Sequence, residues 1–251
     1  MKAVPLTDAG SINLQALQGM LHDAHCHLSF MSNAEAVARD AENAGAVLLA
    51  MTVTPSQYRD ALARFGALPG VAVGAGAHPW WVTAENARVL AEDACSLVAD
   101  APLVGEVGLD FAASHAHTAT FQETVLRAVL SECARCGGKV VSIHCVQACD
   151  QLLAALRETR VCDTCACVLH RFFGQPHQVK ELVELGCWFS VGPQMAESRR
   201  GRHTMGLLPA SRVLFETDAP PCRPEEAPVA YSFSCMSSQL SAVRACFEAL
   251  E

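Results

Sequence analysis

The sequence lacks any long hydrophobic run. Although 51% of its 251 residues are hydrophobic, no stretch approaches the roughly 18 consecutive apolar residues that a transmembrane helix needs. We therefore expect no membrane association. An excess of basic residues is also absent, because the net charge is −8 and the pI is about 5.7. No global positive field attracts nucleic acid, although a local basic patch remains possible.

The first 20 residues lack the charged-then-apolar pattern of a secretory signal. We expect them to form a polar extension before the first strand of a cytoplasmic protein. The 13 cysteines are an odd number, and without a secretory signal they are expected to be reduced thiols. A zinc finger is not favoured, because Cys162, Cys165 and Cys167 have no second Cys-x-x-Cys pair at finger spacing.

Short apolar, β-branched runs alternate with segments rich in Ala, Leu, Glu and Arg. The expected strands lie at 21–25, 47–53, 71–75, 102–107, 139–144, 166–170, 187–191 and 213–217. The expected helices lie at 33–44, 56–65, 84–99, 118–136, 147–158, 176–185, 196–207 and 235–250. Eight alternations predict an α/β fold, a single (β/α)8 TIM barrel over residues 1–251. A doubly wound open sheet is the alternative, but the Gly-rich first turn that it often carries is missing.

Local signals place several helix ends. Asn33 precedes a helical pattern and is a candidate N-cap. Gly45 and Gly186 each follow a helical pattern, in the position of a helix-ending glycine.

In a TIM barrel, the functional side chains lie at the C-terminal ends of the strands. Histidines and carboxylates stand at five of the eight predicted strand ends, namely His25, His27, Glu106, His144, His170 and Asp218. Taken singly, each has a structural explanation, such as a hydrogen-bonded core histidine, an ion-pair partner or a helix N-cap. Together they would be costly to bury without a cation. Four imidazoles and two carboxylates exceed one tetrahedral zinc site and suit two metal ions.

Six ordered motifs from residue 23 to about residue 220 resemble the TatD family of metal-dependent hydrolases within the amidohydrolase superfamily. They are Asp23-Ala24-His25-Cys26-His27-Leu28, Gly76-Ala77-His78-Pro79, Gly105-Glu106-Val107-Gly108-Leu109-Asp110, Ile143-His144, His170-Arg171-Phe172-Phe173-Gly174 and Glu216-Thr217-Asp218-Ala219-Pro220. The resemblance implies a TIM barrel with deoxyribonuclease activity, often as a 3′-to-5′ exonuclease.

The resemblance also implies a ligand set. His25, His27 and Asp218 would hold one ion, His144 and His170 the second, and Glu106 would bridge them. Histidines suit zinc, whereas a nuclease role is compatible with magnesium or manganese. The expected substrate is DNA, single-stranded or at its 3′ ends.

Two departures from the family pattern affect the expected substrate. Val146 stands where the family usually has an arginine, and Arg171 is the candidate to take over its contact with phosphate. The region after Pro220 is shortened. A hydrolase of a small ester, lactone or amide is therefore an alternative, as is a non-catalytic member that binds nucleic acid or a protein.

Asp218 and Glu106 are the predicted catalytic residues, with Asp218 as general base beside the attacking water. The candidate substrate contacts are His78, Arg171, Arg199, Arg200, Arg202 and Arg223. Trp80 and Trp81 could stack on a base, but we favour a role at the barrel rim. Asp110 is expected to order its own loop. A second His-x-His pair, His115 and His117, has no acidic partner nearby in the sequence and is not assigned a function.

Overall fold

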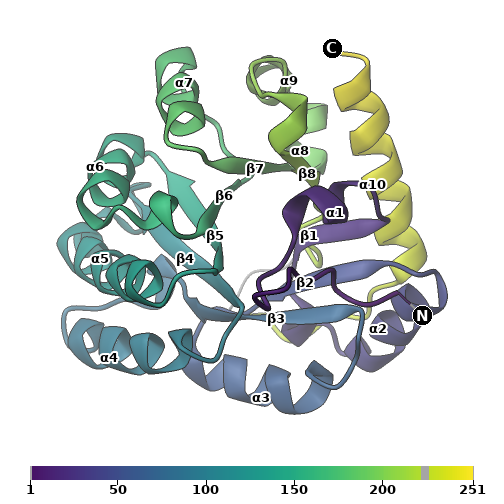
Figure 1. Ribbon diagram of the computed structural model, residues 1–251, viewed down its shortest axis with the longest axis horizontal. Coiled ribbons are helices and arrows are strands. Elements are labelled where there is room, and N and C mark those ends of the chain that lie inside the picture. Colours follow the sequence, from purple (N-terminus) through teal and green to yellow (C-terminus); the bar gives the residue numbers. More distant parts are fainter. Residues whose placement is uncertain (1, 222–225, 251) are drawn as a thin grey trace.

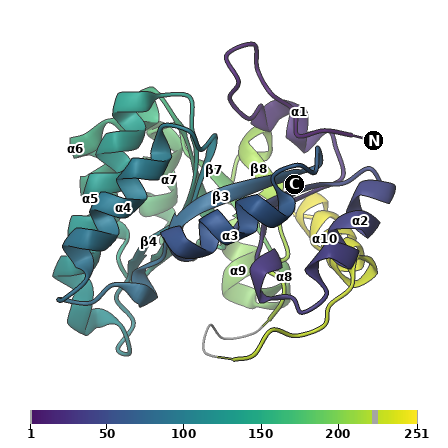
Figure 2. The ribbon, with the colours of Figure 1, turned by 90° about the horizontal axis from the view of Figure 1, so that it is seen from below.

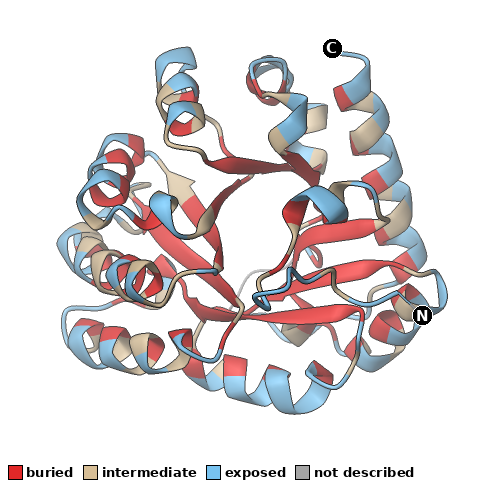
Figure 3. Cartoon of the chain, viewed as in Figure 1, coloured by how far each residue is buried: buried red, intermediate tan, exposed pale blue. Residues whose placement is uncertain are grey.

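The computed structural model describes residues 2–221 and 226–250, which form a ring of eight parallel strands surrounded by helices (Figure 1). The strands follow one another in chain order, so the predicted TIM barrel is confirmed. They are β1 (His22–Cys26), β2 (Val47–Met51), β3 (Val71–Ala77), β4 (Leu103–Asp110), β5 (Val140–Val146), β6 (Ala166–His170), β7 (Trp188–Val191) and β8 (Val213–Phe215). Nearly every strand residue is buried (Figure 3), as in parallel sheets covered on both faces.

Ten helices accompany the strands in the described part of the chain, and all but the first, which lies at one end of the barrel, surround them (Figure 1). They are α1 (Leu14–Gln18), α2 (Ala34–Asn43), α3 (Pro55–Phe65), α4 (Ala87–Val98), α5 (Ala119–Cys136), α6 (Cys149–Thr159), α7 (Pro176–Glu184), α8 (Pro193–Glu197), α9 (Arg199–Met205) and α10 (Phe233–Glu248). Short 3-10 turns lie at η1 (Leu28–Phe30), η2 (Pro79–Trp81), η3 (Ala116–Thr118), η4 (Val161–Asp163) and η5 (Ala210–Arg212).

One predicted helix is wrong, because the segment 196–207 belongs to two helices. The chain is extended at Ser198, with φ −101° and ψ 144°, and the Ser198 side chain accepts a hydrogen bond from the Gly201 N–H at 3.0 Å. A serine that caps a new helix ends the one before it. The result is the pair α8 and α9, whose orientation the single-helix prediction could not give.

The three residues predicted at helix ends lie at the ends of α2 and α7. Gly45 and Gly186 have φ of 68° and 89° and follow α2 and α7, as predicted. Asn33 occupies the predicted N-cap position of α2, but its side chain makes no capping hydrogen bond. Its amide instead pairs with the backbone of Tyr231, donating to the carbonyl at 2.8 Å and accepting from the N–H at 2.9 Å. Asn33 therefore attaches the segment before α10 to the start of α2.

The segment before β1 closes one end of the barrel. Ile12, Leu14 and Leu17 are buried and belong to the apolar cluster inside the strands, with side chains such as Leu49 and Leu214. Figure 2 shows α1 at the opposite end of the barrel from the chain that leads out of β8. The expected polar extension thus includes an apolar plug that the sequence analysis did not identify.

Hydrogen bonds between the end of β1 and the chain after β8 complete the ring. The Asp218 N–H donates to the His25 carbonyl at 2.8 Å, and the His27 N–H donates to the Ala219 carbonyl at 2.8 Å. Asp23, fully buried, accepts from the Thr217 N–H at 3.1 Å and from its hydroxyl at 2.5 Å. These bonds bring the end of β1 and the chain after β8 to one place.

Candidate metal centre

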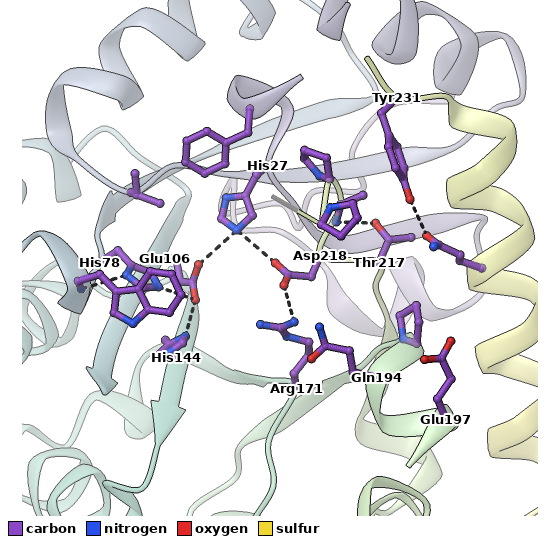
Figure 4. Close-up of a pocket in the computed structure, with 18 of the residues that line it drawn as sticks. His27, His78, Glu106, His144, Arg171, Gln194, Glu197, Thr217, Asp218 and Tyr231 are labelled. Carbon is purple, nitrogen blue, oxygen red and sulfur yellow. Dashed lines mark hydrogen bonds and ion pairs between the residues drawn. The ribbon is translucent and has the colours of Figure 1, made fainter. Parts of the chain in front are cut away.

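The six side chains predicted as ligands converge at the C-terminal end of the barrel, with Glu106 at their centre. Figure 4 shows His27, His144 and Asp218 close to the Glu106 carboxylate. Its Oε2 lies 3.3 Å from His25 Nε2 and 3.4 Å from His27 Nε2. Its Oε1 lies 2.8 Å from His144 Nδ1 and 3.1 Å from His170 Nε2. Each carboxylate oxygen therefore faces a different pair of histidines.

Close packing of β4 on β5 brings Glu106 and His144 together. Gly108 has φ 153°, and a Cβ at this position would lie 2.0 Å from the His144 carbonyl oxygen. Only glycine allows the two strands to approach this closely next to the centre.

Asp218 completes the side of the centre formed by β1. Its Oδ1 lies 3.3 Å from His27 Nε2 and 3.7 Å from His25 Nε2, and its Oδ2 lies 2.6 Å from Arg171 Nη1. Asp218 and Arg171 both have positive φ, 54° and 42°, a conformation that non-glycine residues rarely adopt. Such strained backbone occurs mainly where a side chain must point in one direction.

His78, predicted as a substrate contact, lies in the same cluster and is placed so that it could also be a ligand. It is 4% exposed, and its Nε2 lies 3.2 Å from Glu106 Oε1. His78, Glu106 and His144 form one of three groups whose ligand atoms could hold a metal ion. The other two groups are His25, His27 and Asp218, and His25, Glu106 and His170.

Polar residues behind the histidines fix their orientation. His170 Nδ1 lies 3.1 Å from Glu216 Oε1, and because a carboxylate only accepts, Nδ1 donates this bond and the ring is held with Nε2 directed at Glu106. Ser190 in turn donates to Glu216. His25 Nδ1 is 2.9 Å from Ser142 Oγ. The sequence analysis missed Glu216, although its place two residues before Asp218 at a strand end was an available signal.

Asp110 performs more than the predicted loop ordering. Its Oδ1 accepts from the Ala112 N–H at 2.9 Å, as expected. Its Oδ2 lies 3.0 Å from His144 Nε2 and accepts from Trp80 Nε1 at 2.7 Å. Asp110 therefore positions a candidate ligand and a tryptophan at the same time.

The carboxylates and histidines of the cluster shift one another's pKa values. Burial alone would raise the pKa of Glu106, but the surrounding histidines hold it well below its usual value. Burial would likewise raise the pKa of Asp218, but Arg171 and His27 lower it. Burial would lower the pKa of His27, but hydrogen bonds to Asp218 and Glu106 raise it to about 9. Both carboxylates are thus ionised and attract positive charge to one point.

The donor set fits divalent metal ions. Nε2 of His25 and Nε2 of His27 are only 3.3 Å apart, and both face the carboxylate oxygens. Burial lowers the pKa of His78 to about 4 despite its carboxylate neighbour, so this imidazole is neutral, as a ligand must be. Metal ions among these atoms would satisfy nitrogen and oxygen lone pairs that otherwise depend on shared protons.

A cleft of about 460 Å³ opens above the cluster and is lined by side chains from several strand ends. Arg171 is its only Lys or Arg among the residues that the structure describes. Arg199, Arg200 and Arg202 are not among its lining residues, so their assignment as substrate contacts stays a prediction. Arg200 Nη2 donates to the Phe173 carbonyl at 2.7 Å, and Arg202 Nη1 donates to the Ala196 carbonyl at 2.7 Å. Arg223 lies outside the described residues.

The fold and the histidine–carboxylate cluster define a TIM-barrel protein with a centre able to hold metal ions. The family model described as TatD related DNase matches residues 22–244. The chain belongs to this family.

Curated relatives have similar sequences over parts of their length. The 3′-5′ ssDNA/RNA exonuclease TatD of Edwardsiella piscicida is 36% identical over 49% of this chain and 47% of its own. The enzyme of the same name from Pantoea vagans is 32% identical over 75% of this chain and 73% of its own. The putative deoxyribonuclease TATDN3 of Mus musculus is 30% identical over 49% of this chain and 42% of its own. The match with this chain thus covers about half of the length of the Edwardsiella enzyme and about three quarters of the length of the Pantoea enzyme.

Solved structures show the same fold. YJJV, a TatD homologue from Escherichia coli K12, superposes with a TM-score of 0.75 at 24% identity, over 92% of this chain and 90% of its own. An organophosphorus hydrolase from Deinococcus radiodurans gives 0.52 at 14% identity, over 97% and 86%. No helix in the described part of the chain has the length and apolar character to cross a membrane.

Proposed function

We propose that this protein is a metal-dependent nuclease that hydrolyses phosphodiester bonds of DNA, and that its centre holds two divalent ions. The position of Glu106 carries the proposal. Its Oε2 faces His25 and His27, whereas its Oε1 faces His78, His144 and His170. A carboxylate with each oxygen directed at a different histidine group is suited to bridge two ions, for which zinc, magnesium and manganese are the candidates.

The ligand division follows the two sides of Glu106. In this proposal, His25 and His27, which face Oε2, hold one ion with Asp218, and His144 and His170, which face Oε1 together with His78, hold the other. Divalent ions at such a centre supply Lewis acidity, which acidifies water and offsets the negative charge of a phosphate.

Asp218 is proposed as the general base. Its pKa is held below the usual value by Arg171 and His27, so the carboxylate is ionised and can accept a proton from water. Its two oxygens have different partners, because Oδ2 contacts Arg171 whereas Oδ1 faces the histidines. Arg171 also lines the cleft and is the proposed contact for the substrate phosphate.

The proposed substrate is single-stranded DNA or a 3′ end. Two of the relatives described above carry the name 3′-5′ ssDNA/RNA exonuclease, so RNA is tested beside DNA. The proposed location is the cytoplasm or another reducing compartment, since the twelve cysteines that the structure describes carry free thiols.

Metal analysis of the purified protein, followed by digestion of end-labelled strands, tests the proposal. Single-stranded DNA, double-stranded DNA and RNA are each incubated with zinc, magnesium or manganese. We expect stepwise shortening of single-stranded DNA that a chelator stops. Asp218→Asn should lower turnover at least about 100-fold while much of the metal remains bound, because the amide oxygen can still act as a ligand but cannot accept the proton. Near-wild-type turnover of this variant would refute the role of Asp218.

Hydrolysis of a small ester, lactone or amide is the second candidate. Its support is the sparse positive charge of the cleft, which has Glu197 among its lining residues, together with Val146 at the position where the family usually has an arginine. A metal-loaded sample that cleaves lactones or esters but no nucleic acid would establish this alternative. A sample that binds DNA and hydrolyses none of these substrates would identify a binding protein.

A further inference from the structure

Trp80 forms part of the cleft wall directly after β3. It belongs to the turn η2 and lines the cleft beside His78. Its side chain is large and apolar, yet the residue remains 40% exposed. Trp80 therefore lies at the barrel rim, as the sequence analysis favoured. A position at the rim does not explain why a large indole remains exposed at the cleft.

Contacts from the end of β4 and from the loop after it hold this indole in place. Its Nε1–H donates to Asp110 Oδ2 at 2.7 Å. The His115 ring lies nearly parallel to it, with centroids 4.9 Å apart and an angle of 12° between the planes. His115 comes from the loop between β4 and α5 and had no function in the sequence analysis. An aromatic surface fixed in this way loses little conformational entropy when a flat ligand stacks on it.

The indole is also linked directly to the metal centre. Asp110, which accepts its Nε1–H, contacts His144 Nε2 at 3.0 Å through the same oxygen. The Trp80 and His78 rings meet edge to face with centroids 5.0 Å apart. A planar group stacked on Trp80 therefore lies next to the bond that the centre would cleave.

We propose that Trp80, held by His115 and Asp110, is the binding site for the nucleobase flanking the cleaved phosphodiester. This inference rests on the proposed nuclease function. It adds a second contact with the substrate, because Arg171 would hold the phosphate and Trp80 the base. Stacking requires only the flat face that every base has, so the site selects for the presence of a base rather than its identity.

Paired substrates test the base contact. Two short single-stranded oligodeoxynucleotides are identical except that the residue beside the cleaved bond carries a base in one and is abasic in the other. We expect the wild-type protein to prefer the first by about tenfold in kcat/KM, within the usual range for stacking of a single base. Bis(p-nitrophenyl) phosphate, a diester without a base, reports phosphodiester hydrolysis independently.

Two substitutions of Trp80 separate its ring from its hydrogen bond. Trp80→Phe and Trp80→Leu both remove the Nε1–H donor to Asp110, so any disturbance of His144 is common to the two. Only Trp80→Phe retains an aromatic face. We expect Trp80→Phe to keep most of the tenfold preference and Trp80→Leu to reduce it to less than about twofold. Equal preferences in the wild type and Trp80→Leu would overturn the proposal.

His115 provides a second matched pair. His115→Ala removes the ring parallel to Trp80, whereas His117→Ala removes an exposed histidine two residues away. The preference for a base should fall in His115→Ala and remain in His117→Ala. A fall of the same size in both variants would contradict the role of His115.

A binding measurement distinguishes failure of this proposal from failure of the nuclease function. Adenosine, which has no phosphate, should quench tryptophan fluorescence of the metal-loaded protein in a saturable manner, and Trp80→Phe should abolish most of this quenching. If the wild type hydrolyses no phosphodiester, the proposed function is wrong, and saturable quenching still supports the base site. Hydrolysis without any quenching overturns the base site alone.

Discussion

Glu106 is the residue on which the proposed centre depends most. It is 3% exposed, and its two oxygens contact five histidines. An amide in its place has one oxygen acceptor and no charge, so it can neither bridge two ions nor offset their positive charge.

Glu106→Gln should therefore lose metal as well as activity. We expect turnover to fall at least about 100-fold and bound metal to fall below the wild-type stoichiometry, because losing the bridge weakens both ion sites. Elemental analysis beside the activity assay checks this. Glu197→Gln, which also changes a cleft carboxylate, is the control and should keep the wild-type metal content.

His22 gives a pH dependence of stability that does not involve the metal centre. It is 2% exposed, its Nδ1 lies 3.0 Å from the Met20 carbonyl, and its Nε2 accepts from the Phe215 N–H at 3.1 Å. Burial lowers the pKa of His22 to about 4. The unfolded chain, with a histidine pKa near 6.5, binds this proton first as the pH falls.

The contribution of neutral His22 to the free energy of unfolding should therefore be fully present above about pH 6.5. It should decrease by roughly 3 kcal/mol as the pH falls toward about 4. His22→Gln supplies an acceptor that does not titrate, so its unfolding free energy should depend less steeply on pH in this window. Urea unfolding of both proteins between pH 4 and 7 measures the difference. Identical slopes would show that His22 does not carry the effect.

At the scale of elements, α1 makes an unexpected contribution, since it fills the end of the barrel opposite the metal centre. Leu17 is fully buried there, within the cluster that includes Leu49 and Leu214. Truncating a buried leucine removes apolar contacts and leaves a cavity.

Leu17→Ala should lower the free energy of unfolding by about 3 kcal/mol. Leu62→Ala on α3 is the matched control, because Leu62 is 45% exposed, and it should cost less than about 1 kcal/mol. Denaturant unfolding compares the two variants. A similar small loss in both would mean that α1 is not part of the cooperative core.

At the scale of the whole molecule, charge limits how nucleic acid can bind. The net charge is −8, and Arg171 alone among the described cleft residues is a Lys or Arg. Each phosphate neutralised on a single strand contributes a slope of about −0.7 to a plot of log affinity against log salt. Few phosphates can be neutralised in this cleft.

Binding of single-stranded DNA should accordingly show a shallow salt slope, between about −0.7 and −1.5. Arg171→Gln should weaken binding and flatten the slope further, whereas Arg202→Gln, whose guanidinium bonds the Ala196 carbonyl, should leave the slope unchanged. Fluorescence anisotropy at several salt concentrations, with the metal ion fixed, measures both. A steep slope in the wild type would indicate a basic surface outside the described cleft.

The sequence by itself determined the barrel and the composition of its centre. Alternating apolar and helical segments specify the fold, and the strand ends of such a barrel share one face, so His25, Glu106, His144, His170 and Asp218 had to meet. These inferences need only the order of residues along each strand.

Only the tertiary structure decided which neighbours complete the centre. Whether His78 joins the ligands, whether Glu216 and Asp110 orient them, and whether His115 reaches Trp80 depend on side-chain directions across separate loops. The same holds for Arg200 and Arg202 of α9, which donate hydrogen bonds to backbone carbonyls. Sequence spacing fixes the strand end at which a residue lies, but packing between distant segments fixes what its side chain contacts.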